Sequence, residues 1–280
     1  MTLPVGQISL SQVNTELTKS AGDVISLNDA AVRTLAVKPS GIISMNDLRG
    51  RTSSFNMNIS NQGGGQFDIR QFAVNNGWNQ ISTLNVTIVA DSWSASAGYA
   101  PFLITGSFPR GLNFTVSSGI WVTGRGGNGA AGGGTGAPGG PAISVYGTSG
   151  PITFYNYGQI AGGGGGGSGG ARSDVPWAIA ASGKTPASSG TYYYGGGGGG
   201  GGASYGAGGA GLASTNGTGA AGAGGTLTTG GAGGAGSNGN PGGNGGSLAT
   251  ASGGAAGAAT TGASGVVTWA VVGTRYGAIG

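Results

Sequence analysis

Side chains suited to catalysis are few in this sequence, and their spacing does not bring them together. The 280 residues include 7 Asp or Glu, and they contain no His and no Cys. General acid–base catalysis needs positioned proton donors and acceptors, and the common metal sites and nucleophile–base pairs use His or Cys. The sequence therefore predicts a protein that is not an enzyme and that binds neither a metal nor a cofactor.

Side chains suited to binding a surface are concentrated in segment 171–194. Tyrosine offers a rigid, amphipathic contact at low entropic cost, and Arg and Lys attract acidic groups. The candidate binding residues of this segment are Arg172, Trp177, Lys184, Tyr192, Tyr193 and Tyr194. The alternative interpretation is that the three consecutive tyrosines plug the end of a neighbouring glycine tract against the core and only stabilise the fold.

Glycine dominates the second half of the chain and follows a three-residue period. Glycine supplies 70 of the 280 residues, and one stands at every third position from Gly230 to Gly245. Three residues make one turn of the polyproline II helix, and glycine permits close contact with a neighbour at every turn. The phase breaks at Gly132 and Gly133, so we expect short rods folded back on one another rather than one triple helix. Composition alone also fits disorder, but disordered chains are usually richer in charge than the 6% found here.

Short breaks without glycine separate the tracts and are predicted to be turns between rods. They supply a second group of candidate binding residues, namely Leu212, Asn216, Leu227 and Leu248. The tracts predicted to form rods are 124–140, 161–170, 195–211, 217–225, 230–246 and 253–265. An ordered rod without side chains to bury must hydrogen-bond its backbone to its neighbours.

Composition divides the chain into three predicted domains. Residues 124–280 form the glycine-rich polyglycine II domain, with a strand-like insert at 142–160, the loop 171–194 and a closing strand at 266–272. Residues 53–123 read as a β-rich domain, because Phe55, Met57 and Ile59 alternate with asparagines. Within it, Asp68 is placed to cap a helix that ends before Gly77. The predicted fold class is therefore mainly β and polyglycine II: short N-terminal helical repeats, a β-rich middle domain, and a bundle of folded-back rods joined by loops.

Residues 1–52 contain a threefold repeat. Its units begin Ile8-Ser9-Leu10, Ile25-Ser26-Leu27 and Ile43-Ser44-Met45, and each serine is predicted to cap a short helix. Helices this short are marginal in water by themselves, so we expect the segment to dock on a partner. The alternative is a small helical cap packed on the next domain. The candidate attachment residues are Ile8, Leu10, Val13, Leu17, Ile25, Leu27, Leu35, Ile43, Met45 and Leu48.

Charge and hydrophobicity exclude several other classes of protein. The formal net charge is +4, but the basic residues are scattered, so nucleic acid is not an expected partner. The opening MTLPVGQISL lacks the features of a signal peptide. The apolar stretch 266–272 is too short to cross a bilayer, and no membrane span is expected.

The N-terminal repeat and the glycine-rich sequence together resemble proteins of tailed bacteriophages. The opening GQISLSQVNTEL, with VISLNDAAVRTL and IISMNDLRG, resembles the N-terminal motif of many tail and tail-fibre proteins. The stretches FPRGLNFTV and GPITFYNYGQIAGGGGGG resemble the glycine-rich domain of receptor-binding proteins. The later half is similar to the fibre-tip adhesins of T-even phages, whose folded polyglycine II rods present variable loops to bacterial receptors. This resemblance implies a location in the virion, at the tail or tail-fibre tip.

The resemblance implies an adhesin that recognises a receptor on the host surface, either a protein or lipopolysaccharide. It also implies a phage tail or fibre-tip protein as partner of residues 1–52. Because the repeat is threefold, one copy could dock on a trimeric partner; the alternative is that the chain is itself a trimer. The rival hypothesis is a purely structural tail-tip or baseplate component with a rigid glycine-rich spacer. A more remote one is an ice-binding protein, against which the interrupted glycine phase argues.

Overall fold

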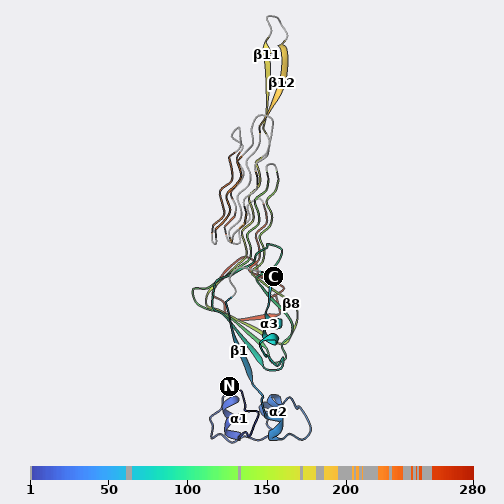
Figure 1. Ribbon diagram of the computed structural model, residues 1–280, viewed down its shortest axis with the longest axis vertical. Helices are drawn as coiled ribbons and strands as arrows, with labels where there is room; N and C mark the ends of the chain where they lie inside the picture. The colour runs from blue at the N-terminus through green and yellow to red at the C-terminus, as the bar shows by residue number, and fades with distance from the viewer. Residues whose placement is uncertain are drawn as a thin grey trace.

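The computed structural model shows an elongated, mainly β protein with its N-terminal segment at one end (Figure 1). It describes residues 2–60, 65–131, 134–170, 173–180, 186–194, 204, 206–207, 210, 220–226, 229–235, 241, 244, 246–247 and 254–280, of which 173–180 and 186–194 are described by backbone alone. The described part holds three α-helices and is otherwise dominated by strands, which confirms the mainly β class.

Three parallel sheets wrap around one core. The first consists of β1 (Ser54–Ile59), β3 (Thr83–Ile88), β6 (Leu112–Val116), β9 (Ile152–Asn156) and β14 (Val267–Val271). The second consists of β4 (Ser92–Trp93), β7 (Trp121–Thr123), β10 (Gln159–Ala161) and β15 (Thr274–Tyr276). The third consists of β2 (Phe67–Asp68), β5 (Phe102–Ser107), β8 (Ile143–Ser149) and β13 (Thr260–Thr261).

The chain visits these sheets in turn, so the three sheets form a parallel β-helix. It runs through β3, β4 and β5, then β6, β7 and β8, then β9, β10 and β13, and ends with β14 and β15. All strand pairs between successive coils are parallel. In a solenoid of this kind each coil packs mainly on its neighbours, and stacking of coils buries a continuous core.

Residues that face inward stack in register from coil to coil. In the first sheet Val86 pairs with Phe114, and Phe114 pairs with Phe154. The ring centroids of Phe114 and Phe154 are 5.0 Å apart, and Trp269 of β14 meets Phe154 edge-on, also at 5.0 Å. The guanidinium of Arg275 lies 4.5 Å from the Trp269 ring centroid and covers the end of this stack. Aromatic stacking therefore ties the last coil to the preceding ones.

The outward face of the first sheet carries an asparagine ladder. Asn56, Asn85 and Asn113 occupy the same register position on β1, β3 and β6. The Nδ2 of Asn85 donates to Oδ1 of Asn56 at 2.6 Å, and that of Asn113 donates to Oδ1 of Asn85 at 2.7 Å. Each amide thus satisfies its neighbour, and the ladder fixes the register of three coils.

The β-helix crosses the predicted boundary between residues 123 and 124. The insert 142–160, predicted as strand-like, forms one strand in each of the three sheets, and the closing strand is β14. Sequence alternation identifies single strands, but it contains no information about which distant strand each one joins.

Both glycine-rich connections leave the β-helix at the corner between the second and third sheets. Segment 94–101 joins β4 to β5, segment 124–142 joins β7 to β8, and segment 162–259 joins β10 to β13. The two glycine-rich connections run away from the β-helix on the side opposite the N-terminal segment (Figure 1). The glycine-rich segments thus extend from one corner of the β-helix.

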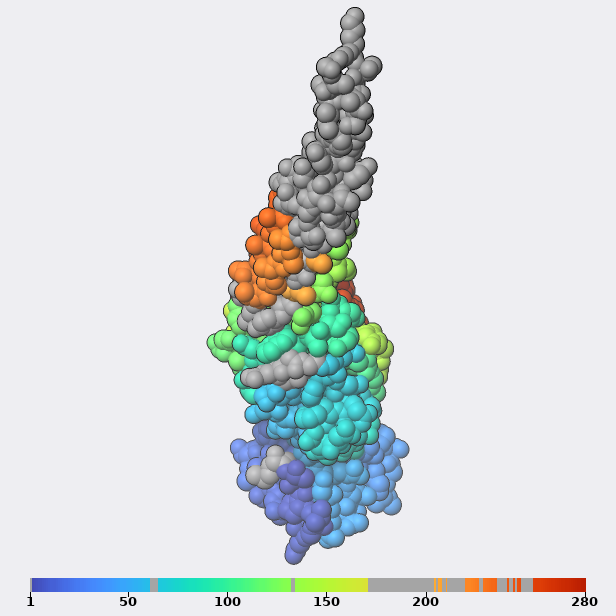
Figure 2. Space-filling view, turned by 45° about the horizontal axis from the view of Figure 1, so that its top comes forward, coloured from blue at the N-terminus to red at the C-terminus, as the bar shows by residue number. Residues whose placement is uncertain are grey.

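Residues 1–52 fold into a small helical unit, which we call the attachment segment. It contains α1 (Leu10–Glu16), α2 (Ala30–Ala36) and a 3₁₀ helix, η1 (Met45–Leu48). Its own core consists of Leu3, Val13, Val32, Leu35, Ala36 and Leu48. Figure 2 shows it in blue as a lobe at one end of the molecule. Among the helices that the structure describes, none is long and apolar enough to cross a membrane.

Helix α3 (Ile69–Asn75) confirms the predicted capping signals. The side chain of Asp68 accepts a hydrogen bond from the backbone N–H of Gln71 at 2.8 Å. Gly77 follows the helix with a φ of +95°, the left-handed conformation that ends many helices. The helix packs Ile69 and Ala73 into the core of the β-helix.

Candidate attachment and receptor sites

The three repeats of the attachment segment share one local geometry. The backbone N–H of Ser9 donates to Oε1 of Gln12 at 2.8 Å, that of Ser26 to Oδ2 of Asp29 at 3.1 Å, and that of Ser44 to Oδ2 of Asp47 at 2.8 Å. Serine followed three residues later by Gln or Asp is thus repeated three times as a capping box or its equivalent. The three repeats share this serine contact, although the helix that follows it differs among them.

The caps were predicted correctly at Ser9 and Ser44 but not at Ser26. Helices α1 and η1 begin directly after Ser9 and Ser44. In the second repeat the N-cap of α2 is Asp29, and Ser26 instead begins the turn that precedes it. The Asp29 carboxylate makes no capping bond to the helix; it accepts from the Ser26 N–H, and the two residues close a turn that delays the helix to Ala30.

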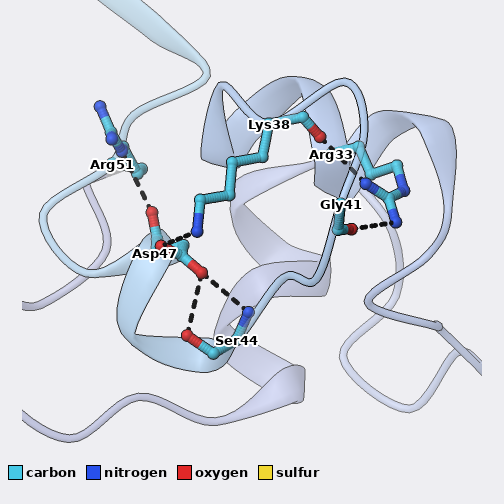
Figure 3. A network of polar contacts seen from close by, with 6 residues as sticks. All are labelled: Arg33, Lys38, Gly41, Ser44, Asp47 and Arg51. Atoms are coloured by element: carbon cyan, nitrogen blue, oxygen red, sulfur yellow. Dashed lines mark hydrogen bonds and ion pairs between the residues drawn. The ribbon is translucent and has the colours of Figure 1, made fainter.

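Asp47 anchors the third repeat through a polar network (Figure 3). Its carboxylate is 2.8 Å from the Nζ of Lys38 and accepts hydrogen bonds from the backbone and the hydroxyl of Ser44. The hydrogen bond from Lys38, followed by those from Ser44, lowers the pKa of Asp47 to about 2. Arg33 ties the adjoining loop together by donating to the carbonyl oxygens of Lys38 at 3.1 Å and of Gly41 at 2.9 Å.

Most candidate attachment residues lie in the core of the attachment segment. Val13, Leu35 and Leu48 are fully buried there. Half-buried side chains pack against them, namely Ile8, Leu17, Ile25, Leu27, Ile43 and Met45. Leu10 is 43% exposed. The apolar pattern of the repeats therefore holds the segment together, and other residues form its outer surface.

That outer surface carries apolar side chains that sequence reasoning missed. Val24 is 98% exposed and Ile42 is 93% exposed, and each directly precedes the isoleucine of a repeat. Val5 and Val37 are exposed as well. We call Val5, Leu10, Val24, Val37 and Ile42 the exposed apolar set. The available signal was the position before each Ile-Ser unit, which in two repeats holds a second β-branched apolar residue.

A buried carboxylate joins the attachment segment to the β-helix. Glu16, at the end of α1, is 2% exposed. Its Oε1 accepts from the backbone N–H of Ser53 at 2.6 Å, and the Ser53 hydroxyl lies 2.9 Å from the same oxygen. Because Ser53 directly precedes β1, this carboxylate fixes the entry of the chain into the β-helix.

The glycine-rich segments bond to one another with a period of three residues. The N–H groups of Gly127 and Ala130 donate to the carbonyls of Gly164 and Gly167 at 2.8 and 2.9 Å, which makes these tracts parallel. Gly163 and Gly166 donate to Gly140 and Ala137, both at 2.9 Å, so this pair of tracts is antiparallel. Gly254 and Gly257 donate in turn to Gly166 and Gly163 at 2.8 Å. Gly246 also donates to Gly165 at 2.8 Å, so four described stretches of chain surround the run 162–167.

Each face of the run 162–167 meets a different neighbour, which explains why it consists only of glycine. A Cβ at Gly163 or Gly166 would lie 2.1 or 2.0 Å from a carbonyl oxygen in 125–128. A Cβ at Gly162 or Gly165 would lie 2.0 Å from the oxygen of Gly257 or Gly254. Residues 162–167 are all buried, and no face has room for a side chain.

Segment 171–194, predicted as a loop, contains a β-hairpin. Strand β11 (Ser173–Ala180) pairs antiparallel with β12 (Pro186–Tyr194). Trp177 stands opposite Gly190, and Tyr192 stands opposite Val175. Tyr193 and Tyr194 follow in the same strand. Figure 1 places β11 and β12 at the end of the molecule opposite the attachment segment.

The other candidate binding residues fall outside the part of the chain that the structure describes. They are Arg172 and Lys184 from segment 171–194, and Leu212, Asn216, Leu227 and Leu248 from the breaks between glycine tracts. Within the described residues no cluster of three or more acidic side chains is arranged to hold a metal ion.

The architecture defines a structural class: an elongated parallel β-helix with a helical lobe at one end and a projecting hairpin at the other. The chain belongs to the phage tail fibre adhesin Gp38 family, whose model matches residues 53–280. This confirms the resemblance seen in the sequence and places the protein on the tail fibre of a bacteriophage virion. No curated protein matches the sequence.

A solved structure extends the likeness to the attachment segment. The crystal structure of the gp37-gp38 adhesin tip complex of the bacteriophage S16 long tail fibre matches with a TM-score of 0.62 and 24% sequence identity. The match covers 98% of this chain and 98% of the S16 chain. The two proteins therefore share their fold over residues 1–52 as well, where the family model does not reach.

Proposed function

We propose that this protein is the adhesin at the tip of a phage tail fibre and that it recognises a receptor on the bacterial surface through segments at its far end. The observation that carries this proposal is the packing of the run 162–167, which makes the glycine-rich extension a stiff support. A rigid support lowers the entropy lost when the segments that it carries bind a target. The role proposed is one of binding, without catalysis.

We interpret the glycine-rich tracts as polyglycine II rods. Three observations support this interpretation: the three-residue step of the hydrogen bonds, their direction from one tract to another, and the contact of each face with its own neighbour. A three-residue turn without internal hydrogen bonds is the geometry of the polyproline II family. Bonds to neighbouring rods satisfy the backbone in place of internal ones.

The receptor surface proposed is segment 171–194 together with the turns near residues 212, 216, 227 and 248. Aromatic side chains in this segment suit a sugar or protein surface, and Arg172 and Lys184 suit the acidic groups of lipopolysaccharide. The hairpin is supported as a binding element by its position, because it lies farthest from the attachment segment (Figure 1).

The test is to replace residues 173–194 by a short Gly-Ser link in the virion and to measure adsorption to host cells. Strands β11 and β12 pair only with each other, so the three sheets should stay intact. We expect adsorption to fall at least tenfold, and Tyr146→Ala, an exposed change on the β-helix, serves as the control. Unchanged adsorption would remove the hairpin from the receptor site. If, in addition, the isolated protein showed no saturable binding to host cells, a structural spacer would replace the adhesin.

The partner proposed for residues 1–52 is a phage tail or fibre-tip protein, with a trimer as the form that suits three quasi-equivalent repeats. Exposed apolar side chains commonly mark a protein interface, and Val24 and Ile42 are almost fully exposed at matching positions. Three tethered contacts add through effective concentration. The S16 structure is a complex of gp37 with gp38, which supports a fibre protein as the partner here.

We expect the double variant Val24→Asp with Ile42→Asp to leave the chain folded but absent from the virion. A matched control is Val272→Asp, which changes an exposed valine of the β-helix. Quantitative mass spectrometry of purified virions would count the copies of the chain. Incorporation of the double variant at the level of the control would refute attachment through these residues, and three copies per fibre would refute docking of one copy on a trimer.

A further inference from the structure

A cavity of about 470 Å³ lies between the attachment segment and the base of the β-helix. Its apolar wall includes Val37 and Pro39 from the attachment segment and Ile81 from the β-helix. Arg33, Lys38 and Arg110 add three basic side chains. A cavity of this size, mostly apolar and with a few charged groups, has the character of a binding site.

The backbone of Arg110 is held rigidly in a tight turn between β5 and β6. The N–H of Gly111 donates to the carbonyl of Phe108 at 2.8 Å, and Gly111 has a φ of +95°. The side chain of Phe108 is fully buried and stacks on Trp78 at 5.8 Å. The hydroxyl of Thr83 donates to the carbonyl of Arg110 at 3.1 Å. The backbone position from which the Arg110 side chain extends is therefore fixed.

Arg110 is the basic residue of the cavity whose side chain has neither a hydrogen-bond nor an ionic partner within the described part of the chain. Lys38 pairs with Asp47, and Arg33 donates to two carbonyl oxygens (Figure 3). Arg33 also donates to Oδ1 of Asn28 at 2.8 Å. No hydrogen bond or ion pair to the Arg110 guanidinium is formed by any residue that the structure describes. Arg110 is half-buried, and this partial burial lowers the pKa of its guanidinium. A desolvated cation without a partner is costly, and an anion in the cavity would relieve that cost.

We propose that the cavity binds a carboxylate side chain from an apolar segment of the fibre partner, and that the Arg110 guanidinium donates two parallel hydrogen bonds to it. This inference rests on the attachment proposed above and names what is recognised there. Guanidinium binds carboxylate in a bidentate manner, which gives orientation as well as affinity. The partner chain is the occupant because the attachment segment supplies much of the wall, including Val37 of the exposed apolar set. Charge complementarity then sets the angular position of the adhesin on the fibre.

The test measures the dissociation constant between the full-length chain and fibres purified from virions that lack it, together with the thermal midpoint of the free chain. We expect Arg110→Met to weaken binding at least tenfold, and Arg110→Lys to fall between Arg110→Met and the wild type. The exposed Arg49→Met is the control for loss of one positive charge, and it should stay within twofold of the wild type. The midpoint of free Arg110→Met should stay equal or rise, because an uncompensated charge has been removed.

Equal binding by Arg110→Met and the wild type would overturn this inference while the proposed attachment stands. A lowered midpoint of free Arg110→Met would also overturn it, because the arginine would then be a structural residue of the fold. If the wild-type chain did not bind fibres at all, both the attachment and this inference would fail.

Discussion

Gly163→Ala is predicted to destabilise the glycine-rich bundle severely, although it adds a single methyl group. The new Cβ would lie 2.1 Å from the carbonyl oxygen of Arg125 and 2.4 Å from its carbon. Real Cβ atoms do not approach backbone this closely, so one tract must move by more than an ångström. Gly163 donates to Gly140 at 2.9 Å and accepts from Gly257 at 2.8 Å, and the movement breaks at least one of these bonds.

The magnitude follows from two terms. Overpacking a dense interior costs about 1–3 kcal/mol, and a buried backbone group that loses its partner adds about 1–3 kcal/mol. We therefore expect a loss of about 2–6 kcal/mol in the free energy of unfolding of the glycine-rich tracts. The matched control is Gly224→Ala, where the nearest atom lies 3.5 Å away. That change should be neutral or stabilise by about 0.4–1 kcal/mol through the unfolded state.

The assay combines thermal unfolding with hydrogen exchange of the amides that bond across the tracts, such as those of Gly127 and Gly166. Gly163→Ala should accelerate exchange of both amides and leave the asparagine-ladder strands β1, β3 and β6 protected. Equal stability of the two alanine variants would refute the close packing of the run 162–167, and with it the interpretation of the tracts as a rod bundle.

Two further predictions concern the attachment segment. The pKa of Asp47 is lowered from 3.8 to about 2, so its interactions stabilise the fold above pH 4 and are lost as pH falls toward 2. Asp47→Asn should flatten the pH dependence of the unfolding midpoint in that window, and an unchanged slope would contradict the assignment. Glu16→Ala leaves the buried N–H of Ser53 without its acceptor and should cost about 1–3 kcal/mol in urea unfolding, whereas Glu16→Gln should cost less. An equal loss in the free energy of unfolding for both substitutions would contradict a stabilising role for the hydrogen bond that the Glu16 carboxylate oxygen accepts.

Local signals in the sequence were sufficient for single elements. Alternation located β1, Asp68 and Gly77 bounded α3, and Ser9 and Ser44 marked two of the three helical starts. Each of these depends on interactions within a few residues, which a pattern can show. The predicted attachment residues proved to be mostly core residues, because an apolar periodicity does not indicate whether its apolar face is covered by the same chain or by another.

The β-helix was not predicted, because its order lies in pairings between distant residues. Asn56 bonds to Asn85, and Asn85 bonds to Asn113, over separations of 29 and 28 residues. That nearly constant spacing was the available signal of a coil repeat. The following coil is interrupted by segment 124–142, and the next by segment 162–259. These glycine-rich insertions break the constant spacing, so the coil repeat cannot be recognised in the later sequence. The hairpin β11–β12 was missed because Gly, Ser and Pro in segment 171–194 favour a loop over a strand.

The single corner from which the glycine-rich connections leave has a consequence for how host range can change. Segment 162–259 departs and returns at neighbouring points, since Gly163 and Gly257 are joined by a 2.8 Å hydrogen bond. The insert is therefore attached to the β-helix as a loop whose two ends lie side by side. Doubling the length of such a loop raises the entropic free-energy cost of closing it by only about 0.6 kcal/mol. We therefore expect that recombination between phages can exchange the far end, which is proposed above to bind the receptor, while the coils and residues 1–52 keep their geometry. With the receptor-binding segments placed as proposed, a phage could change its receptor without changes in the β-helix.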